Sequence, residues 1–192
     1  LAAVGVGMVA VIAVVLVAMP ALGTPVLKEY QTERLTSFLS PSSDIGDAGY
    51  QQNQAKVGIG AGGTTGRGDQ ATQSRLGFVP ERHTDLIFAV VAERYGFLGA
   101  ALVLSLYALL FWRALRLMTL SKNAYGTLVA AGIAGAIVFQ VFVNVGMNLG
   151  IMPITGIPLP LMSYGGSAVI STFLMVGVLQ SIAIQSRAGQ RG

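Results

Sequence analysis

The most constraining feature of this sequence is a series of long apolar runs with almost no charged residues. Residues 1–23 carry no charge at all, and as a helix this run would be about 35 Å long, enough to cross a bilayer. Similar runs cover residues 84–112, 125–150 and 166–186. We therefore predict an all-α, polytopic membrane helix bundle with four transmembrane helices and one large extracellular loop at residues 24–83.

The composition supports a membrane protein over a soluble one. Of the 192 residues, 53% are hydrophobic and 10% are charged, whereas a soluble domain carries about 25% charged residues. There is no cysteine, which excludes disulfides and thiolate metal sites. The chain does not start with Met, and its first run lacks the flanks of a signal peptide. We therefore expect it to be part of a longer protein.

The charges are distributed as membrane topology requires. All eight acidic residues lie between Glu29 and Glu93, and six basic residues but no acid follow from Arg94 onward. By the positive-inside rule, residues 113–123 and the C-terminal tail are cytoplasmic. The long loop at 24–83 and the uncharged connection at 151–165 are then extracellular. Nucleic-acid binding is excluded, because charges partitioned in this way indicate membrane topology and not a nucleic-acid footprint.

Two features of the outer loop have competing interpretations. Residues 58–63 match the G-x-G-x-x-G dinucleotide fingerprint, but this fingerprint needs a strand before it and a helix after it. We interpret them as flexible or tightly packed backbone. Residues 27–39 have apolar side chains on one side, which predicts either a short interfacial helix or an ordinary linker helix.

Ionisable side chains gather in the loop and at the start of the second span, where the head of a lipid-anchored substrate would lie. His83 has no second histidine nearby, so it is a poor metal ligand. Glu93 and Arg94 are expected to lie roughly 12 Å deeper than Asp85, at 1.5 Å per helical residue. Adjacent residues cannot meet on one helix face, so each is expected to pair elsewhere, for function or for structure.

Residues 153–160 contain three prolines and one glycine, which excludes a regular helix. This apolar segment lies at the predicted outer face, where irregular backbone must be buried in protein or line a cavity. Ser163 and Tyr164 follow it, and Ser163 is placed near the start of the last span. The segment is therefore either a rigid turn or the wall of a substrate cavity.

Four stretches of this chain, in this order, resemble the SEDS (shape, elongation, division, sporulation) family of membrane proteins. They are LKEYQTERLTSFLSPSSD, AGYQQNQAKVGIGAGG, TQSRLGFVPERHTDLIFAVVAERYGFLGA and NVGMNLGIMPITGIPLPLMSYGGSA. PERHTD and the lysine of QAKVGIGAGG are more like the rod-shape branch (RodA) than the division branch (FtsW). The resemblance covers nearly the whole chain and implies the C-terminal half of a protein with about ten spans.

The resemblance implies an inverting glycosyltransferase of the bacterial cytoplasmic membrane, with its active site on the outer face. Its substrate would be lipid II, polymerised during cell elongation and shape maintenance in complex with a class B penicillin-binding protein. Asp44 matches the family's essential acid, although Ile45 replaces a proline and Asp47 a glycine of that motif. Arg94 also stands where a second glutamate is usual, and the stretch at 68–72 is about one residue short. This part alone is expected to be inactive.

The chemistry of such a transfer is consistent with these residues. One carboxylate takes the proton of the acceptor sugar hydroxyl, and the pyrophosphate needs cations. The candidate substrate-binding residues are Lys56, Arg67, Arg75, Arg82, His83, Asp85, Ser163 and Tyr164. No cofactor is required by the motifs, and a divalent cation is left open. The alternatives are a lipid II flippase, in which Glu93 and Arg94 line the path, and a non-catalytic scaffold for the transpeptidase.

Overall fold

The computed structural model describes residues 47–71, 84–121 and 123–188, which form helices and connecting loops without strands. The helices are α4 (Asp47–Gly62), α6 (Ile87–Leu120), α7 (Ala124–Leu149) and α8 (Gly166–Ala188), with a short 3₁₀ helix η2 (Gly68–Gln70). Within these ranges, three helices are long and apolar enough to cross a membrane: Ile87–Leu120, Ala124–Leu149 and Gly166–Ser186. The all-α class is confirmed, while the predicted span at 1–23 and the helix at 27–39 lie outside the described residues.

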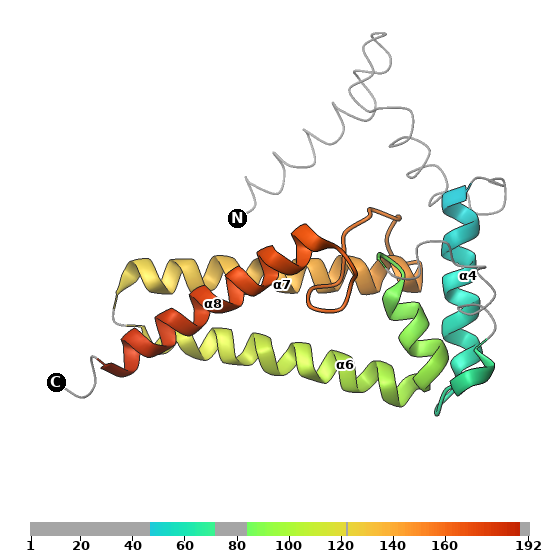
Figure 1. Cartoon of the computed structure of the whole chain (residues 1–192), viewed down its shortest axis with the longest axis horizontal. Coiled ribbons are helices and arrows are strands. Elements are labelled where there is room, and N and C mark those ends of the chain that lie inside the picture. Colours follow the sequence, from blue (N-terminus) through green and yellow to red (C-terminus); the bar gives the residue numbers. More distant parts are fainter. Residues whose placement is uncertain (1–46, 72–83, 122, 189–192) are drawn as a thin grey trace, which may run out of the picture.

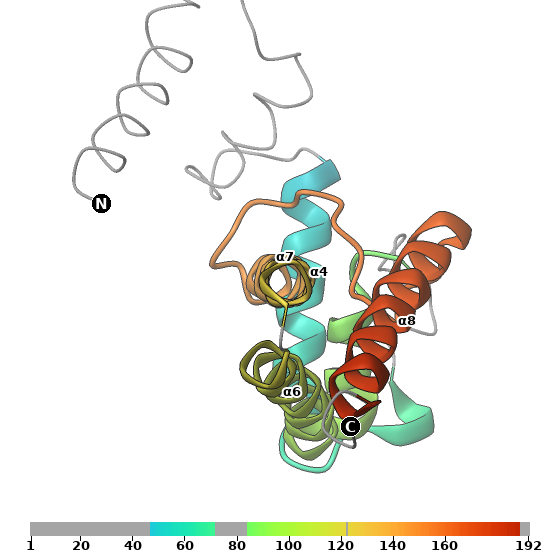
Figure 2. The same ribbon diagram turned by 90° about the vertical axis from the view of Figure 1, so that its left-hand side faces the viewer.

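The three membrane-length helices run beside one another, and α4 lies across one end of them (Figures 1 and 2). We call this the α4 end, where α7 ends and the proline-rich loop at 151–165 begins. The opposite end is the hairpin end, where a connection of three residues (121–123) joins α6 to α7. α4 was not predicted, because four glycines among its 16 residues are typical of a loop and not of a helix.

α6 is bent rather than straight. Gly96 has φ 66° and ψ −163° within the helix, so residues 87–95 run beside α4 before the chain turns into the long arm of α6 (Figure 1). The bend frees backbone N–H groups that a straight helix would pair, and the loop after α4 accepts them. Phe97 donates to the carbonyl of Gly63 at 2.9 Å and Leu98 to that of Thr64 at 3.2 Å. The backbone N–H groups that the bend frees are therefore paired.

Two predicted boundaries are corrected by α6. The second span was predicted at 84–112 with a connection at 113–123, but the helix continues to Leu120. Arg113 and Arg116 lie on this helix with exposed side chains. Arginine is a good helix former and its long stem lets the charge reach water from a helix end, so a charged residue does not end a span.

The residues of the dinucleotide-like motif up to Gly62 lie inside α4, so the strand–turn–helix context of a nucleotide site is absent there. Gly62 packs directly on α6: a Cβ at this position would collide with the carbonyl oxygen of Ala92. Gly66 and Gly96 make a similar backbone contact in the bend, both with positive φ. Tight backbone packing is therefore found at Gly62, whereas a Cβ at Gly60 or Gly63 would meet no atom within 4 Å.

Candidate active site at the α4 end

The predicted site residues divide into those that the structure describes and those that it does not. Asp44, Arg75, Arg82 and His83 lie outside the described residues. The others fall into two groups at the α4 end: Lys56, Asp85, Ser163 and Tyr164 near the end of α7, and Arg67, Glu93 and Arg94 near the bend of α6.

Two asparagines of α7 hold the group near the end of that helix. Asn144 and Asn148 are both 0% exposed and lie four residues apart, hence on one helix face. Both side-chain amides donate to the carbonyl oxygen of Asp85, at 2.9 Å from Asn144 and 3.2 Å from Asn148. The backbone immediately before α6 is therefore attached to α7 by two hydrogen bonds on one acceptor.

The same asparagines join the proline-rich loop and the first turn of α6 to this junction. Asn144 also donates to the carbonyl of Ile157 at 2.8 Å. The side-chain oxygen of Asn148 accepts from the N–H of Ala89 at 3.2 Å. Each buried amide thus has several partners, as amides in an apolar environment require.

Ser163 belongs to this junction through both functions of its hydroxyl. The side chain is 4% exposed, donates to the carbonyl of Thr84 at 2.6 Å and accepts from the N–H of Leu159 at 2.7 Å. This engagement favours an indirect role for Ser163 over the predicted contact with substrate. Its neighbour Tyr164 is 83% exposed, so its ring is accessible for binding.

α4 is fastened to the end of α7 by Gln52 and Lys56. The Gln52 amide donates to the carbonyls of Met147 at 3.1 Å and Met152 at 2.8 Å. Lys56 crosses Gly150, which ends α7 in the left-handed region with φ 74°, so closely that a Cβ there would collide with the lysine stem. The ammonium thus lies near the negative end of the α7 dipole while its side chain remains exposed.

At the bend, Glu93 and Arg94 have different surroundings. Glu93 is 1% exposed, and its backbone carbonyl accepts from the N–H of Arg67 at 2.9 Å. Arg94 is exposed and pairs with Asp69 at 3.4 Å. Both residues precede Gly96 and lie on the arm beside α4, which is bent away from the long arm of α6. The rise per residue along a straight helix therefore does not give their depth in the membrane. The expectation that Arg94 pairs elsewhere is confirmed.

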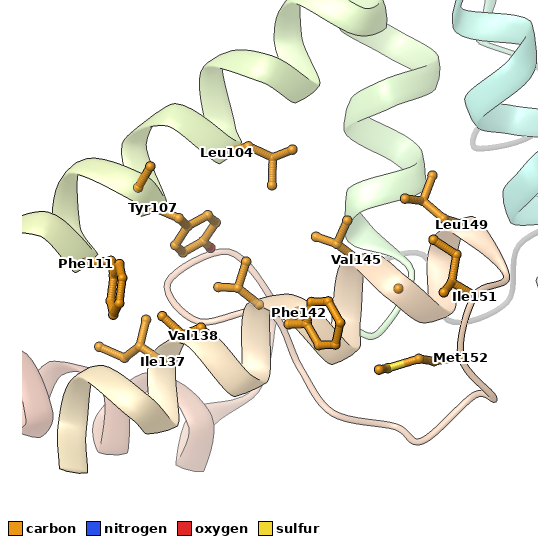
Figure 3. A pocket seen from close by; sticks show the side chains of 13 residues that line it. Leu104, Tyr107, Phe111, Ile137, Val138, Phe142, Val145, Leu149, Ile151 and Met152 are labelled. Atoms are coloured by element: carbon orange, nitrogen blue, oxygen red, sulfur yellow. The ribbon is translucent and has the colours of Figure 1, made fainter. Parts of the chain in front are cut away.

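An apolar cavity of about 340 Å³ lies between the long arm of α6, α7 and the start of the proline-rich loop. Figure 3 shows side chains of both helices facing this space, among them Leu104, Phe111 and Phe142. Tyr107 lines it too and donates a hydrogen bond to the carbonyl of Pro160. The loop therefore turns back from the α4 end to reach the long arm of α6. Ile154, Leu159 and Ser163 of the loop are buried, whereas Thr155 is exposed.

Sequence reasoning missed Asn144, Asn148 and Gln52. The signal for the asparagines was present: two amides at i and i+4 in a run that is otherwise apolar must share a face and find partners. Gln52 carried no comparable signal, because a polar residue in a polar loop is ordinary. In the described ranges, no group of three His, Cys, Asp or Glu residues could hold a metal ion.

The three apolar helices and the polar junction at their end define an integral membrane protein of the polytopic α-helical class. The profile of one family, FTSW_RODA_SPOVE (cell cycle protein), matches residues 1–188. The chain belongs to this family.

Relatives of known name agree with this assignment. The chain is 45% identical over 174 residues to the peptidoglycan glycosyltransferase MrdB of Escherichia coli K12, covering 89% of this chain and 47% of that protein. It is 45% identical to the peptidoglycan glycosyltransferase RodA of Treponema pallidum, covering 84% of this chain and 37% of RodA. Stage V sporulation protein E of Bacillus subtilis is 39% identical, with 82% and 43% covered. The chain therefore spans about half the length of these relatives or less.

Two solved structures share the fold. A chain of a peptidoglycan synthase complex, studied for its coordination of polymerization and crosslinking, superposes with a TM-score of 0.69 at 37% identity, covering 92% of this chain and 48% of that one. A mutant of the rod shape determining protein RodA of Thermus thermophilus gives a TM-score of 0.52 at 37% identity, covering 64% and 38%.

Proposed function

We propose that this chain is the C-terminal half of a peptidoglycan glycosyltransferase that polymerises lipid II on the outer face of the bacterial cytoplasmic membrane. The observation that carries the proposal is the 45% identity to MrdB across 89% of this chain. The similarity is greater to MrdB and RodA than to the sporulation relative, which supports a role in elongation and cell shape. A class B penicillin-binding protein is the proposed partner, because the structural neighbour belongs to a peptidoglycan synthase complex.

In the proposed reaction, Asp44 accepts the proton of the acceptor sugar hydroxyl. The oxygen then attacks the anomeric carbon of the donor sugar while the bond from that carbon to the pyrophosphate oxygen breaks. The configuration inverts, and undecaprenyl pyrophosphate leaves. Lys56, Arg67, Arg75 and Arg82 are the proposed cations for the pyrophosphate. Of these, Lys56 and Arg67 have exposed side chains at the α4 end, where they can meet a lipid headgroup.

The flippase alternative receives less support from the geometry. It requires Glu93 and Arg94 to line a path through the membrane. In the structure Glu93 is buried against the loop after α4, and Arg94 pairs with the exposed Asp69 at 3.4 Å. At the α4 end, Glu93 is therefore buried and the Arg94 side chain is paired.

The decisive experiment measures glycan polymer formation by the purified full-length protein from lipid II. Asp44→Asn should lower the rate by roughly 10²–10⁴-fold, the usual loss for a positioned general base. Asp47→Gly is the matched control three residues away, at the first residue of α4, and is expected within about tenfold of wild type because the family usually has glycine there. The residues 1–192 alone should form no polymer.

A transporter would tolerate Asp44→Asn and move lipid II without making polymer. An active Asp44→Asn variant combined with an inactive Asp47→Gly variant would show that Asp44 is not the base.

A further inference from the structure

We propose that Asn144 and Asn148 are positioning residues for the polymerisation reaction, which act by holding the backbone at Thr84 and Asp85. This inference rests on the proposed function. It adds to it two residues of a membrane helix that do not themselves touch the substrate.

The short segment at Thr84 and Asp85 is held by hydrogen bonds from three side chains. The carbonyl of Asp85 accepts from both asparagine side chains, at 2.9 and 3.2 Å. The preceding carbonyl, that of Thr84, accepts from the Ser163 hydroxyl at 2.6 Å. Two consecutive carbonyls are thus held by three side chains from α7 and the proline-rich loop, which leaves this stretch little freedom to shift.

Packing of α7 against its neighbours does not by itself require an amide at positions 144 and 148. Leucine has the same branched side-chain shape as asparagine, although it is larger, and an apolar side chain can occupy a fully buried position on an apolar helix at no desolvation cost. Both asparagines are nevertheless 0% exposed, and Asn148 also donates to the backbone carbonyl of Asn144 at 2.8 Å. Buried polar networks of this kind specify one arrangement of the segments that they join.

The held segment includes a candidate substrate-binding residue, Asp85, which has a partly exposed side chain. Ser163, which completes the set of donors, is followed by Tyr164, 83% exposed. The same hydrogen bonds therefore set the backbone positions of Asp85 and Tyr164 relative to each other. A small displacement of such groups from their working positions costs far more in catalysis than in stability.

The test uses the full-length protein with Asn144→Leu and Asn148→Leu, each assayed for lipid II polymerisation over a range of substrate concentrations. We expect KM for lipid II to rise by roughly tenfold or more, because the binding groups are displaced. The matched control is Thr172→Val on α8. Thr172 is 3% exposed and its hydroxyl bonds at 2.7 Å to Ala168, within its own helix, so its loss should leave KM unchanged.

The readout separates positioning from plain stability. A variant that is merely less stable has fewer active molecules, so its apparent kcat falls while KM stays at the wild-type value. Such a result for both asparagine variants, with KM unchanged, would overturn the inference. If the leucine variants give no folded protein, Asn144→Ser and Asn148→Ser keep a smaller polar group and should still raise KM. An unchanged KM in both serine variants would also overturn the inference.

Failure of the proposed function has a different signature. The wild-type protein itself would then form no glycan polymer, and the inference would fail with it. Polymer from the wild type, together with wild-type KM in every asparagine variant, refutes the positioning role alone.

Discussion

At the α4 end, four segments meet through buried amides, a buried hydroxyl and glycine backbones in direct contact, whereas at the hairpin end α6, α7 and α8 pack through small apolar side chains. The hairpin-end cluster consists of Ala114, Ala130, Ala134 and Leu179, all buried. Its partly buried neighbours are larger apolar residues such as Phe111 and Ile182. The α4 end instead buries Gln52, Asn144, Asn148 and Ser163.

The two ends differ in what their packing can specify. Alanine contacts bring helices close together without directional bonds, as is usual between membrane helices. Hydrogen bonds between side chains and particular carbonyls have one good geometry and lose it on displacement. The α4 end is therefore suited to hold a reactive arrangement of groups, and the hairpin end to connect spans.

The two ends are predicted to face opposite sides of the membrane. The chain has no cysteine, so a single introduced thiol has no background. In intact cells, a membrane-impermeant thiol reagent should label Thr155→Cys, at the exposed residue of the proline-rich loop. Asn123→Cys, in the hairpin connection, should react only after permeabilisation. Labelling of Asn123→Cys in intact cells would reverse the proposed topology.

The glycine contacts at the α4 end predict the largest effect on stability. Gly62→Ala places a Cβ against the Ala92 carbonyl, and we expect it to destabilise the protein by about 1–3 kcal/mol or more. Gly60→Ala, two residues earlier in the same helix, meets no atom within 4 Å and should stabilise α4 by about 0.5–1 kcal/mol. Thermal unfolding in detergent measures both. If the Gly62→Ala and Gly60→Ala variants had equal melting temperatures, α4 would not pack on α6 as described.

A smaller loss is expected from overpacking at the hairpin end. Ala134→Leu enlarges a side chain that is 3% exposed, and relaxation by helix sliding should keep the cost near the lower end of about 1–3 kcal/mol. Gly135→Leu, one position later, places its Cβ in open space and should not destabilise the protein, because leucine has a higher helix propensity than glycine. If Ala134→Leu lowered the free energy of unfolding as much as Gly62→Ala, the two ends would not differ in how they tolerate a larger side chain.

The smallest effect should come from the ion pair near the bend. Arg94 and Asp69 have side chains that are 52% and 90% exposed, and exposed pairs contribute about 0.2–1 kcal/mol. Arg94→Gln should therefore change the melting temperature little. A large decrease would indicate that Arg94 has further partners at the α4 end.

Much of the architecture could be predicted because it depends on solvation of single residues. The apolar runs predicted three of the described helices, and three prolines predicted the irregular loop before α8. The bend of α6 could not be predicted in this way. Gly96 adopts a positive φ because Gly63 and Thr64 accept hydrogen bonds from the residues after it, and no local pattern reveals a partner more than thirty positions away.

The candidate site shows the same division. Lys56, Asp85 and Tyr164 were selected from residue type and position, and the structure places them near one end of α7, whereas Arg67, Glu93 and Arg94 gather at the bend. The asparagines that organise the first group were overlooked, although their spacing put them on one face. Only the fold shows that both meet the carbonyl of Asp85, which lies 59 residues from Asn144 along the chain.

Residue types and their spacing were enough to predict that this chain is embedded in a membrane, that its spans are helical and that its polar groups concentrate at one side. These properties follow from the cost of placing charges and unpaired backbone groups in lipid, which each residue bears independently of its distant neighbours. The tertiary structure alone decided where α6 bends, which glycines touch backbone and which carbonyls the buried amides hold. Those outcomes depend on pairs of groups far apart in the chain, because a hydrogen bond or a close contact exists only when both members are brought together.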